Sequence, residues 1–258
     1  MNDTFDFDLD DLSPADDASA EAVERFWDED MVLLSQHRST PHGSHSFCLA
    51  HDQSLTWGIP GAPQLVAVVV ARDLSRGTFT VETSSHATAS FAQNWLVERG
   101  CPPGSILVGD GFPQPGDDLT LQIEQQVRES GTRYAFLDSY TEDIDRVETW
   151  TLVRDSRAAQ APIRVFLQDW HLDAGIYTMR EGAFADVGAA QTWLDERSGP
   201  LPEPPEYDDR NGPVVRARIA RMALARSFGT SELPRTGPNA LRTPAAALVP
   251  RPVQGRLL

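Results

Sequence analysis

Lysine is absent from this 258-residue chain, and all 22 of its basic residues are arginine. Two interpretations are open. A GC-rich genome favours codons for arginine, alanine and proline, whereas selection against lysine would protect the protein from a lysine-directed conjugation system. We favour genome composition, because arginine and lysine differ physically at only some kinds of site.

Cysteines and long apolar runs are also scarce. Two cysteines, Cys48 and Cys101, are too few for a disulfide framework in a protein of this size. The longest apolar run, from Leu65 to Ala71, is too short for a bilayer-spanning helix. Residues 1–30 hold twelve carboxylates and one arginine, whereas a secretory signal needs a basic start and an apolar stretch. We therefore expect a cytoplasmic protein with no membrane partner.

Charge is distributed unevenly along the chain. Residues 1–30 sum to −11, residues 31–209 to −13 and residues 210–258 to +8, which gives the net charge of −16. Nucleic acid and anionic membranes repel a protein of this charge. Only the basic C-terminal segment is suited to contact nucleic acid.

An internal repeat is the clearest pattern in the chain. Residues 73–99 and 171–197 align without a gap, with ten identical residues in 27 positions. We interpret this similarity as a duplication. In each copy an apolar stripe at helical spacing predicts a buried helix face, so we expect the repeat core to contain Trp95, Leu96, Trp193 and Leu194.

The predicted fold class is α+β, with two duplicated helix–four-strand–helix units. The first unit comprises a helix from 20 to about 36, strands over 46–50, 55–59, 65–71 and 78–81, and a closing helix. The second comprises a helix from 119 to about 129, strands over 134–140, 147–153, 163–167 and 176–179, and a closing helix. We expect two-layer units, with helices on one face of each antiparallel sheet, packed with pseudo-twofold symmetry.

This pattern divides the chain into five parts. Residues 1–18 are predicted to be a disordered acidic segment, 19–100 the first repeat and 101–199 the second repeat. Residues 200–229 combine a proline-rich linker with a basic amphipathic helix from 213 to 228. Residues 230–258 are predicted to be a disordered tail.

The densest group of metal-ligating residue types is the run His42, His45, Cys48 and His51. Imidazole and thiolate suit zinc or copper. However, the run lies in a loop entering a strand, and structural zinc sites usually draw on two separated pairs of ligands. We expect these side chains not to converge, and we expect no metal site and no cofactor.

The two ends carry the candidate partner-binding residues. Near the N-terminus, Phe5, Phe7 and Leu9 alternate with acidic residues, a pattern typical of segments that fold onto a partner. The C-terminal helix combines an apolar stripe with arginines: Val215, Arg216, Arg218, Ile219, Arg221, Met222 and Arg226.

The sequence indicates a non-enzymatic binding or adaptor protein, because no motif of an activated nucleophile is present. Its most concrete form is an acidic chaperone or neutraliser of a basic protein partner. Two alternatives stay open: a metal-dependent enzyme centred on the His/Cys run, and a nucleic-acid accessory protein acting through the C-terminal arginines.

Overall fold

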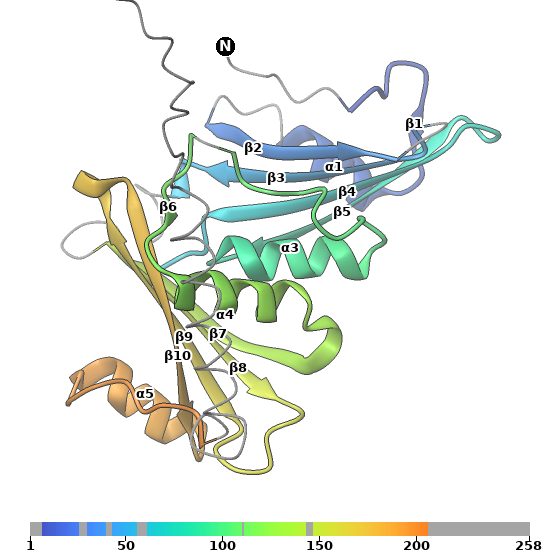
Figure 1. Ribbon diagram of the computed structural model, residues 1–258. Helices are drawn as coiled ribbons and strands as arrows, with labels where there is room; N and C mark the ends of the chain where they lie inside the picture. Colours follow the sequence, from blue (N-terminus) through green and yellow to red (C-terminus); the bar gives the residue numbers. More distant parts are fainter. Residues whose placement is uncertain are drawn as a thin grey trace, which may run out of the picture.

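The computed structural model describes residues 7–25, 30–39, 43–55, 61–109, 111–142 and 147–205. These residues form two five-stranded sheets with helices packed against them (Figure 1). The α+β class predicted from the sequence is confirmed. No helix in this part of the chain has the length and apolar character that a membrane crossing requires.

The first sheet has the strand order β1-β5-β4-β3-β2. All neighbouring strands are antiparallel except β1 and β5, which are parallel. A bulge between Leu33 and Ser35 interrupts the pairing of the edge strand β2. The elements of this half are β1 (Ser13–Pro14), α1 (Asp17–Arg25), β2 (Met31–Arg38), β3 (His45–Asp52), β4 (Leu65–Asp73), β5 (Thr78–His86) and α3 (Ala89–Glu98).

The second sheet has the strand order β6-β10-β9-β8-β7, again with one parallel pair, β6 and β10. A bulge between Phe136 and Asp138 interrupts its edge strand β7. Short 3-10 turns, η1 (Gly131–Arg133) and η2 (Leu172–Ala174), precede β7 and β10. The other elements are β6 (Gln114–Pro115), α4 (Asp118–Arg128), β7 (Tyr134–Glu142), β8 (Glu148–Asp155), β9 (Ile163–His171), β10 (Ile176–Phe184) and α5 (Val187–Glu196).

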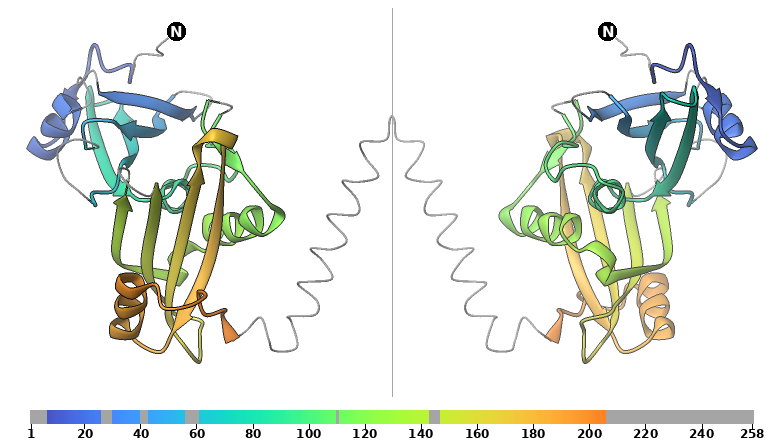
Figure 2. Two further views of the ribbon diagram at one scale, coloured as in Figure 1. Left: turned by 90° about the vertical axis from the view of Figure 1, so that its left-hand side faces the viewer. Right: turned by 90° about the vertical axis from the view of Figure 1, so that its right-hand side faces the viewer.

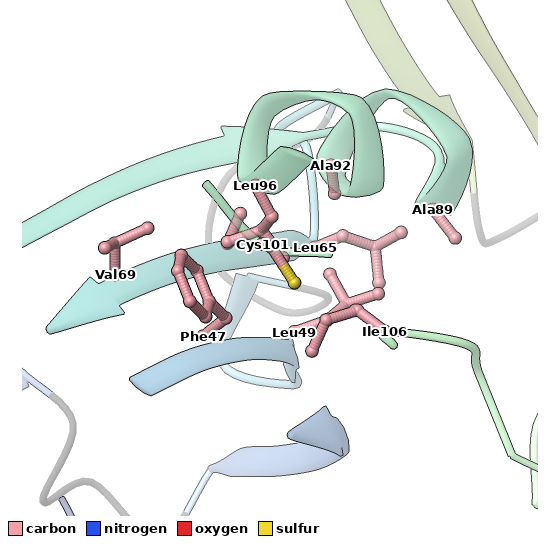
Figure 3. Close-up of a cluster of buried hydrophobic side chains, with 10 residues drawn as sticks. Phe47, Leu49, Leu65, Val69, Ala89, Ala92, Leu96, Cys101 and Ile106 are labelled. Atoms are coloured by element: carbon pink, nitrogen blue, oxygen red, sulfur yellow. The ribbon is translucent and has the colours of Figure 1, made fainter. Parts of the chain in front are cut away.

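Helices cover both faces of each sheet, which corrects the predicted two-layer arrangement. Phe47 and Leu49 on β3 pack with α3, as the close-up in Figure 3 shows, whereas Cys48 lies in the cluster on the opposite face, with α1. In the second half α5 packs on one face and α4 on the other. The apolar run in β4 explains this, because consecutive side chains of a strand point to opposite faces and both faces then need cover.

One predicted element of the first half is wrong, and a second is tested only at its first residue. Residues 20–36 were expected to form one helix, but α1 ends at Arg25 and β2 begins at Met31. The apolar residues of the two segments mimic helical spacing in sequence, yet the second set pairs with β3. Leu55 does not continue a strand, and the rest of the predicted strand over 55–59 lies outside the described residues.

Residues 7–18 are packed, which corrects the prediction of disorder for this part of the N-terminal segment. Phe7 is buried in the cluster between α1 and the first sheet, with Leu9 and Leu12 beside it. The acidic residues alternate with these apolar ones and stay exposed, so high charge does not prevent the segment from packing.

The halves meet through α3 and α4, which lie side by side between the two sheets (Figure 1). Phe91 of α3 packs edge-on against Tyr134 and Phe166 of the second sheet. The side chain of Asn94 exchanges two hydrogen bonds, of 2.9 and 3.1 Å, with the backbone of Gly131. The last helix of one half thus contacts the first helix of the other, so the packing is head to tail and the expected pseudo-twofold is wrong. Consequently α1 and α5 lie at opposite ends of the molecule (Figure 2).

Candidate functional site

The first helix of each half is fixed to its sheet by the same hydrogen bonds. Asp16 accepts a bond of 2.7 Å from the Ser19 backbone, and the Ser19 hydroxyl accepts one of 3.0 Å from the Val81 amide. In the second half Asp117 caps α4 through the Thr120 amide at 2.8 Å, and the Thr120 hydroxyl accepts a 2.9 Å bond from Met179. Each hydroxyl satisfies a buried strand amide and thereby sets the position of its helix.

A sequence signal for this anchor is present and was missed. Residues 14–19 and 115–120 both read Pro-x-Asp-Asp-x-Ser/Thr, but their spacing of 101 residues differs from the 98 of the longer repeat. The first copy begins within the acidic segment 1–18, whose composition favours disorder. The structure therefore assigns residues 13–19 a defined place beside β5.

An N-terminal arm, defined here as residues 7–12, lies over the same face of the first sheet. Arg72, which is 9% exposed, donates from Nε to the carbonyl of Phe7 at 3.0 Å and from Nη2 to the Ser46 hydroxyl at 2.8 Å. Asp8 has φ +52°, so the backbone turns sharply there. The chain is thus held at the start of the arm, and Leu9 and Leu12 lie against α1.

A shallow hollow of about 330 Å³ that is open to solvent, called here the α1 cavity, lies between the arm, α1 and β5. Its lining is apolar except at one position. The lining residues are Leu9, Asp10, Leu12, Pro14, Ala20, Val23 and Phe79. Such a lining accommodates aliphatic or aromatic side chains.

Larger side chains stand at the matching positions of the second half. Counting from the anchoring hydroxyls, Leu121 and Glu124 of α4 correspond to Ala20 and Val23 of α1. Tyr177 stands where the first half has Phe79, and its hydroxyl donates to the Glu124 carboxylate. Burial raises the pKa of Glu124 and of Tyr177 above their usual values. The first half therefore has room where the second half has a hydrogen-bonded side chain.

The elements that line the α1 cavity are strongly acidic. Residues 7–25 contain seven carboxylates and one arginine. Each of these carboxylates belongs to an exposed residue: Asp8, Asp10, Asp11, Asp16, Asp17, Glu21 and Glu24. Hydrogen bonds from Ser19 lower the pKa of Asp16, so it remains ionised. An apolar cavity formed by acidic segments, with Asp10 in its lining, complements an apolar side chain flanked by cations.

The structure separates the metal-ligand candidates that it describes. His45 and His51 lie on β3 six residues apart, about 20 Å along a strand, and Cys48 points to the opposite face. His51 pairs with Gln64 at 3.2 Å, and burial raises the pKa of Cys48 to about 12. His42 lies outside the described residues. Among described residues, no three metal-ligating side chains cluster.

The predicted repeat-core residues occupy their expected helices. Leu96 is fully buried on α3, and Trp193 and Leu194 are each 9% exposed on α5. Trp95 is half-buried beneath the Arg99 guanidinium, 3.6 Å from the ring centroid. Trp193 likewise has Arg197 4.9 Å above its ring. These tryptophans are packing residues with a cationic cover.

The partner-binding candidates divide into three groups. Phe7 is a core residue and is not exposed to a partner, whereas Leu9 lines the α1 cavity. Phe5 and all seven candidates of the C-terminal helix, Val215 to Arg226, lie outside the described residues. Sequence reasoning thus found one edge of the cavity and missed α1 and Phe79.

Two other features are less suited to bind a basic partner. A cavity of about 290 Å³ at the α3–α4 contact has Arg128 and Glu129 in its lining, so it presents charges of both signs. A buried ionic cluster centres on Arg164, which is 1% exposed and lies 3.6 Å from both Asp155 and Glu181. Its burial keeps it from solvent, so its role is to position the strands beneath α4.

Comparison of the chain with known protein families, curated proteins and solved structures gives no match.

Proposed function

We propose that this chain is a non-enzymatic binding protein of the cytoplasm whose first half binds a basic amphipathic segment of a protein partner. The α1 cavity, with its apolar lining on two strongly acidic segments, is the observation that carries the proposal. The partner would be a basic protein that this acidic one chaperones or neutralises.

We propose further that the two halves derive from one duplicated unit. The repeat in residues 73–99 and 171–197 supports this, as do the shared element order and the matching edge-strand bulges. The two hydroxyl anchors extend the correspondence to individual bonds. Duplication lets one copy keep a filled helix–sheet junction while the other carries an open one.

Apolar contact supplies most of the affinity in this proposal. Complete burial of one leucine or phenylalanine side chain stabilises a complex by about 1.5–3 kcal/mol. An exposed ion pair contributes about 0–1 kcal/mol, and salt screens it. The carboxylates of α1 and the arm therefore accelerate association and select basic partners, while the cavity holds the anchoring side chain.

A designed peptide tests the proposal. The probe is a labelled 16-residue peptide with leucine at positions 3, 7, 10 and 14 and arginine and alanine elsewhere. Its affinity for the full chain is measured by fluorescence anisotropy, beside a scrambled peptide of equal composition. We expect the amphipathic peptide to bind more tightly than the scrambled one, because only it presents a continuous apolar stripe.

Ala20→Leu supplies the decisive variant, since it introduces into α1 the leucine that α4 carries at the same position. It should weaken binding about tenfold or more, equivalent to about 1.4 kcal/mol. The matched control is Ala189→Leu on the exposed surface of α5, which should leave affinity unchanged. If Ala20→Leu and Ala189→Leu bind the amphipathic peptide with equal affinity, the α1 cavity is not the binding site. If the two peptides bind with equal affinity and high salt abolishes the binding of both, the contact is governed by charge alone.

A further inference from the structure

We infer that the basic segment 213–228 of this same chain occupies the α1 cavity when no partner is bound. This inference rests on the proposed function and adds its regulation. The segment itself lies outside the described residues, so the case is made from its sequence and from the site that would receive it.

The chemistry of the segment matches the cavity. Residues 213–228 contain four arginines and no acidic residue, against a charge of −6 for residues 7–25. The apolar residues Val215, Ile219 and Met222 are spaced by four and three positions, which places them on one stripe of the predicted helix. An unbranched methionine fits irregular apolar space, and the α1 cavity is lined by leucine, valine and phenylalanine.

The described chain ends beside the second sheet, at the end of the molecule opposite α1, so the length of the linker matters (Figure 2). The Pro202 carbonyl accepts a 2.9 Å bond from the Ala183 amide, which fixes this stretch at the edge of β10. Measured perpendicular to the layers, the second sheet and α1 are three layer spacings of about 10 Å apart, or about 30 Å. Ten residues separate Pro202 from Pro213 and span up to about 35 Å when extended. The linker alone therefore exceeds the spacing of the layers, and the predicted helix adds about 1.5 Å for each further residue toward Ile219.

Occupation in cis makes the cavity a regulated site. A partner must displace the segment. The apparent affinity of the partner is therefore its intrinsic affinity multiplied by the fraction of molecules in which the cavity is open. Local concentration favours the tethered segment over free peptides of similar affinity. Only a partner that binds more tightly, or at high concentration, would then be captured.

Peptide binding to the full chain tests the competition. In the variant Ile219→Ser/Met222→Ser the anchors are removed, and affinity for the 16-residue probe should rise about tenfold, because the open fraction rises. The matched control Leu248→Ser/Val253→Ser makes two equivalent changes in the tail and should leave affinity unchanged. Replacing Arg218 and Arg221 by glutamine should raise affinity less than the serine pair does.

Limited trypsin digestion tests docking without any probe. The serine variant keeps every arginine, so faster cleavage after Arg216 to Arg226 than in the wild type or control variant reports release of the segment. Ala20→Leu should accelerate the same cleavages, because it fills the cavity. Rates should not depend on protein concentration, and a concentration dependence would assign the occupant to a second copy and overturn docking in cis.

Failure of the inference is distinguishable from failure of the proposed function. If the serine pair changes neither peptide affinity nor cleavage while Ala20→Leu still weakens peptide binding, the cavity binds partners but the tail does not occupy it. If the probe binds neither the wild type nor the serine variant, the proposed function itself is wrong.

Discussion

His86 shows how position in the fold sets the chemistry of a single residue. It ends β5, 6.2 Å from the ring of Trp95, which Arg99 covers. Burial lowers the pKa of His86 to about 4, and the nearby positive charge of Arg99 acts in the same direction. Phe184 holds the corresponding place at the end of β10. The folded protein therefore favours a neutral ring at this position.

This burial predicts a pH dependence of stability. In the unfolded chain the imidazole titrates near pH 6.5, whereas in the folded chain it titrates near 4. Between these values the unfolded chain binds more protons, so the free energy of unfolding falls as the pH is lowered through this window. The loss is about 2 kcal/mol at pH 5.

His86→Phe should remove this contribution. Urea unfolding of the variant and the wild type, at pH 7.5 and pH 5, measures it. At each pH we compare the free energy of unfolding of the variant with that of the wild type. We expect this difference to favour the variant more at pH 5 than at pH 7.5. The exposed His171→Gln serves as a control and should behave as the wild type at both pH values. An identical pH dependence in His86→Phe and the wild type would contradict a neutral buried ring.

At the scale of elements, the hydroxyl anchors of α1 and α4 matter most. Ser19→Ala leaves the amide of Val81 without its acceptor, and Thr120→Ala does the same to Met179. Each substitution should lower the free energy of unfolding by about 1–3 kcal/mol, the cost of a buried unsatisfied amide. Chemical denaturation checks this, with exposed Thr80→Ala on β5 as control. If Ser19→Ala and Thr120→Ala lower the free energy of unfolding by no more than the control does, the hydroxyl anchors do not stabilise the fold.

How far the sequence predicts an element depends on what stabilises it. Residues 118–128 form α4 much as expected, with Asp117 as its N-cap, because capping and helical spacing are local signals. Gly77 and Gly175, which are identical residues of the repeat, both adopt φ +63° at the turns before β5 and β10, a conformation that glycine reaches at little cost. The edge strand β2 was missed because its pairing with β3 is a non-local interaction that no periodicity encodes.

The α1 cavity was beyond sequence reasoning for the same kind of reason. It exists because the arm, α1 and β5 are brought together by Arg72 and Ser19, across more than 60 residues of sequence. Leu9 was recognised as a candidate partner contact from its acidic neighbours. Nothing in the sequence around Ala20 and Val23 indicates a cavity. Their small size becomes informative only when they are compared with Leu121 and Glu124, the residues at the matching positions of α4.

At the scale of the whole molecule, the α3–α4 contact decides whether the halves act as one body. The ring of Phe91 packs edge-on against two rings that also contact each other, with its centroid 5.3 Å from that of Phe166 and 6.1 Å from that of Tyr134. Phe91→Ala should lower stability by about 3 kcal/mol and split thermal unfolding into two transitions, because the halves lose their shared packing. Exposed Phe136→Ala is the matched control and should keep a single transition. A single transition in both variants would mean that the halves unfold together without this contact.

The head-to-tail arrangement also leaves α1 at one end of the molecule, away from the contact between the halves (Figure 2). The α1 cavity is lined by Ala20 and Val23 of this helix. A partner can therefore reach the acidic surface without separating the two sheets. The duplication, as we propose it, would supply one half as a support and the other as a binding module.

The most direct test of this account is amide hydrogen–deuterium exchange of the full-length Ile219→Ser/Met222→Ser variant, with and without the 16-residue amphipathic peptide. We predict that the peptide slows exchange in residues 9–23 and around Phe79, and that Ala20→Leu in the same background abolishes this protection. Protection confined to the exposed edge strand around Phe136, or to the α3–α4 cavity around Leu107, would contradict the assignment of the binding site to the α1 cavity.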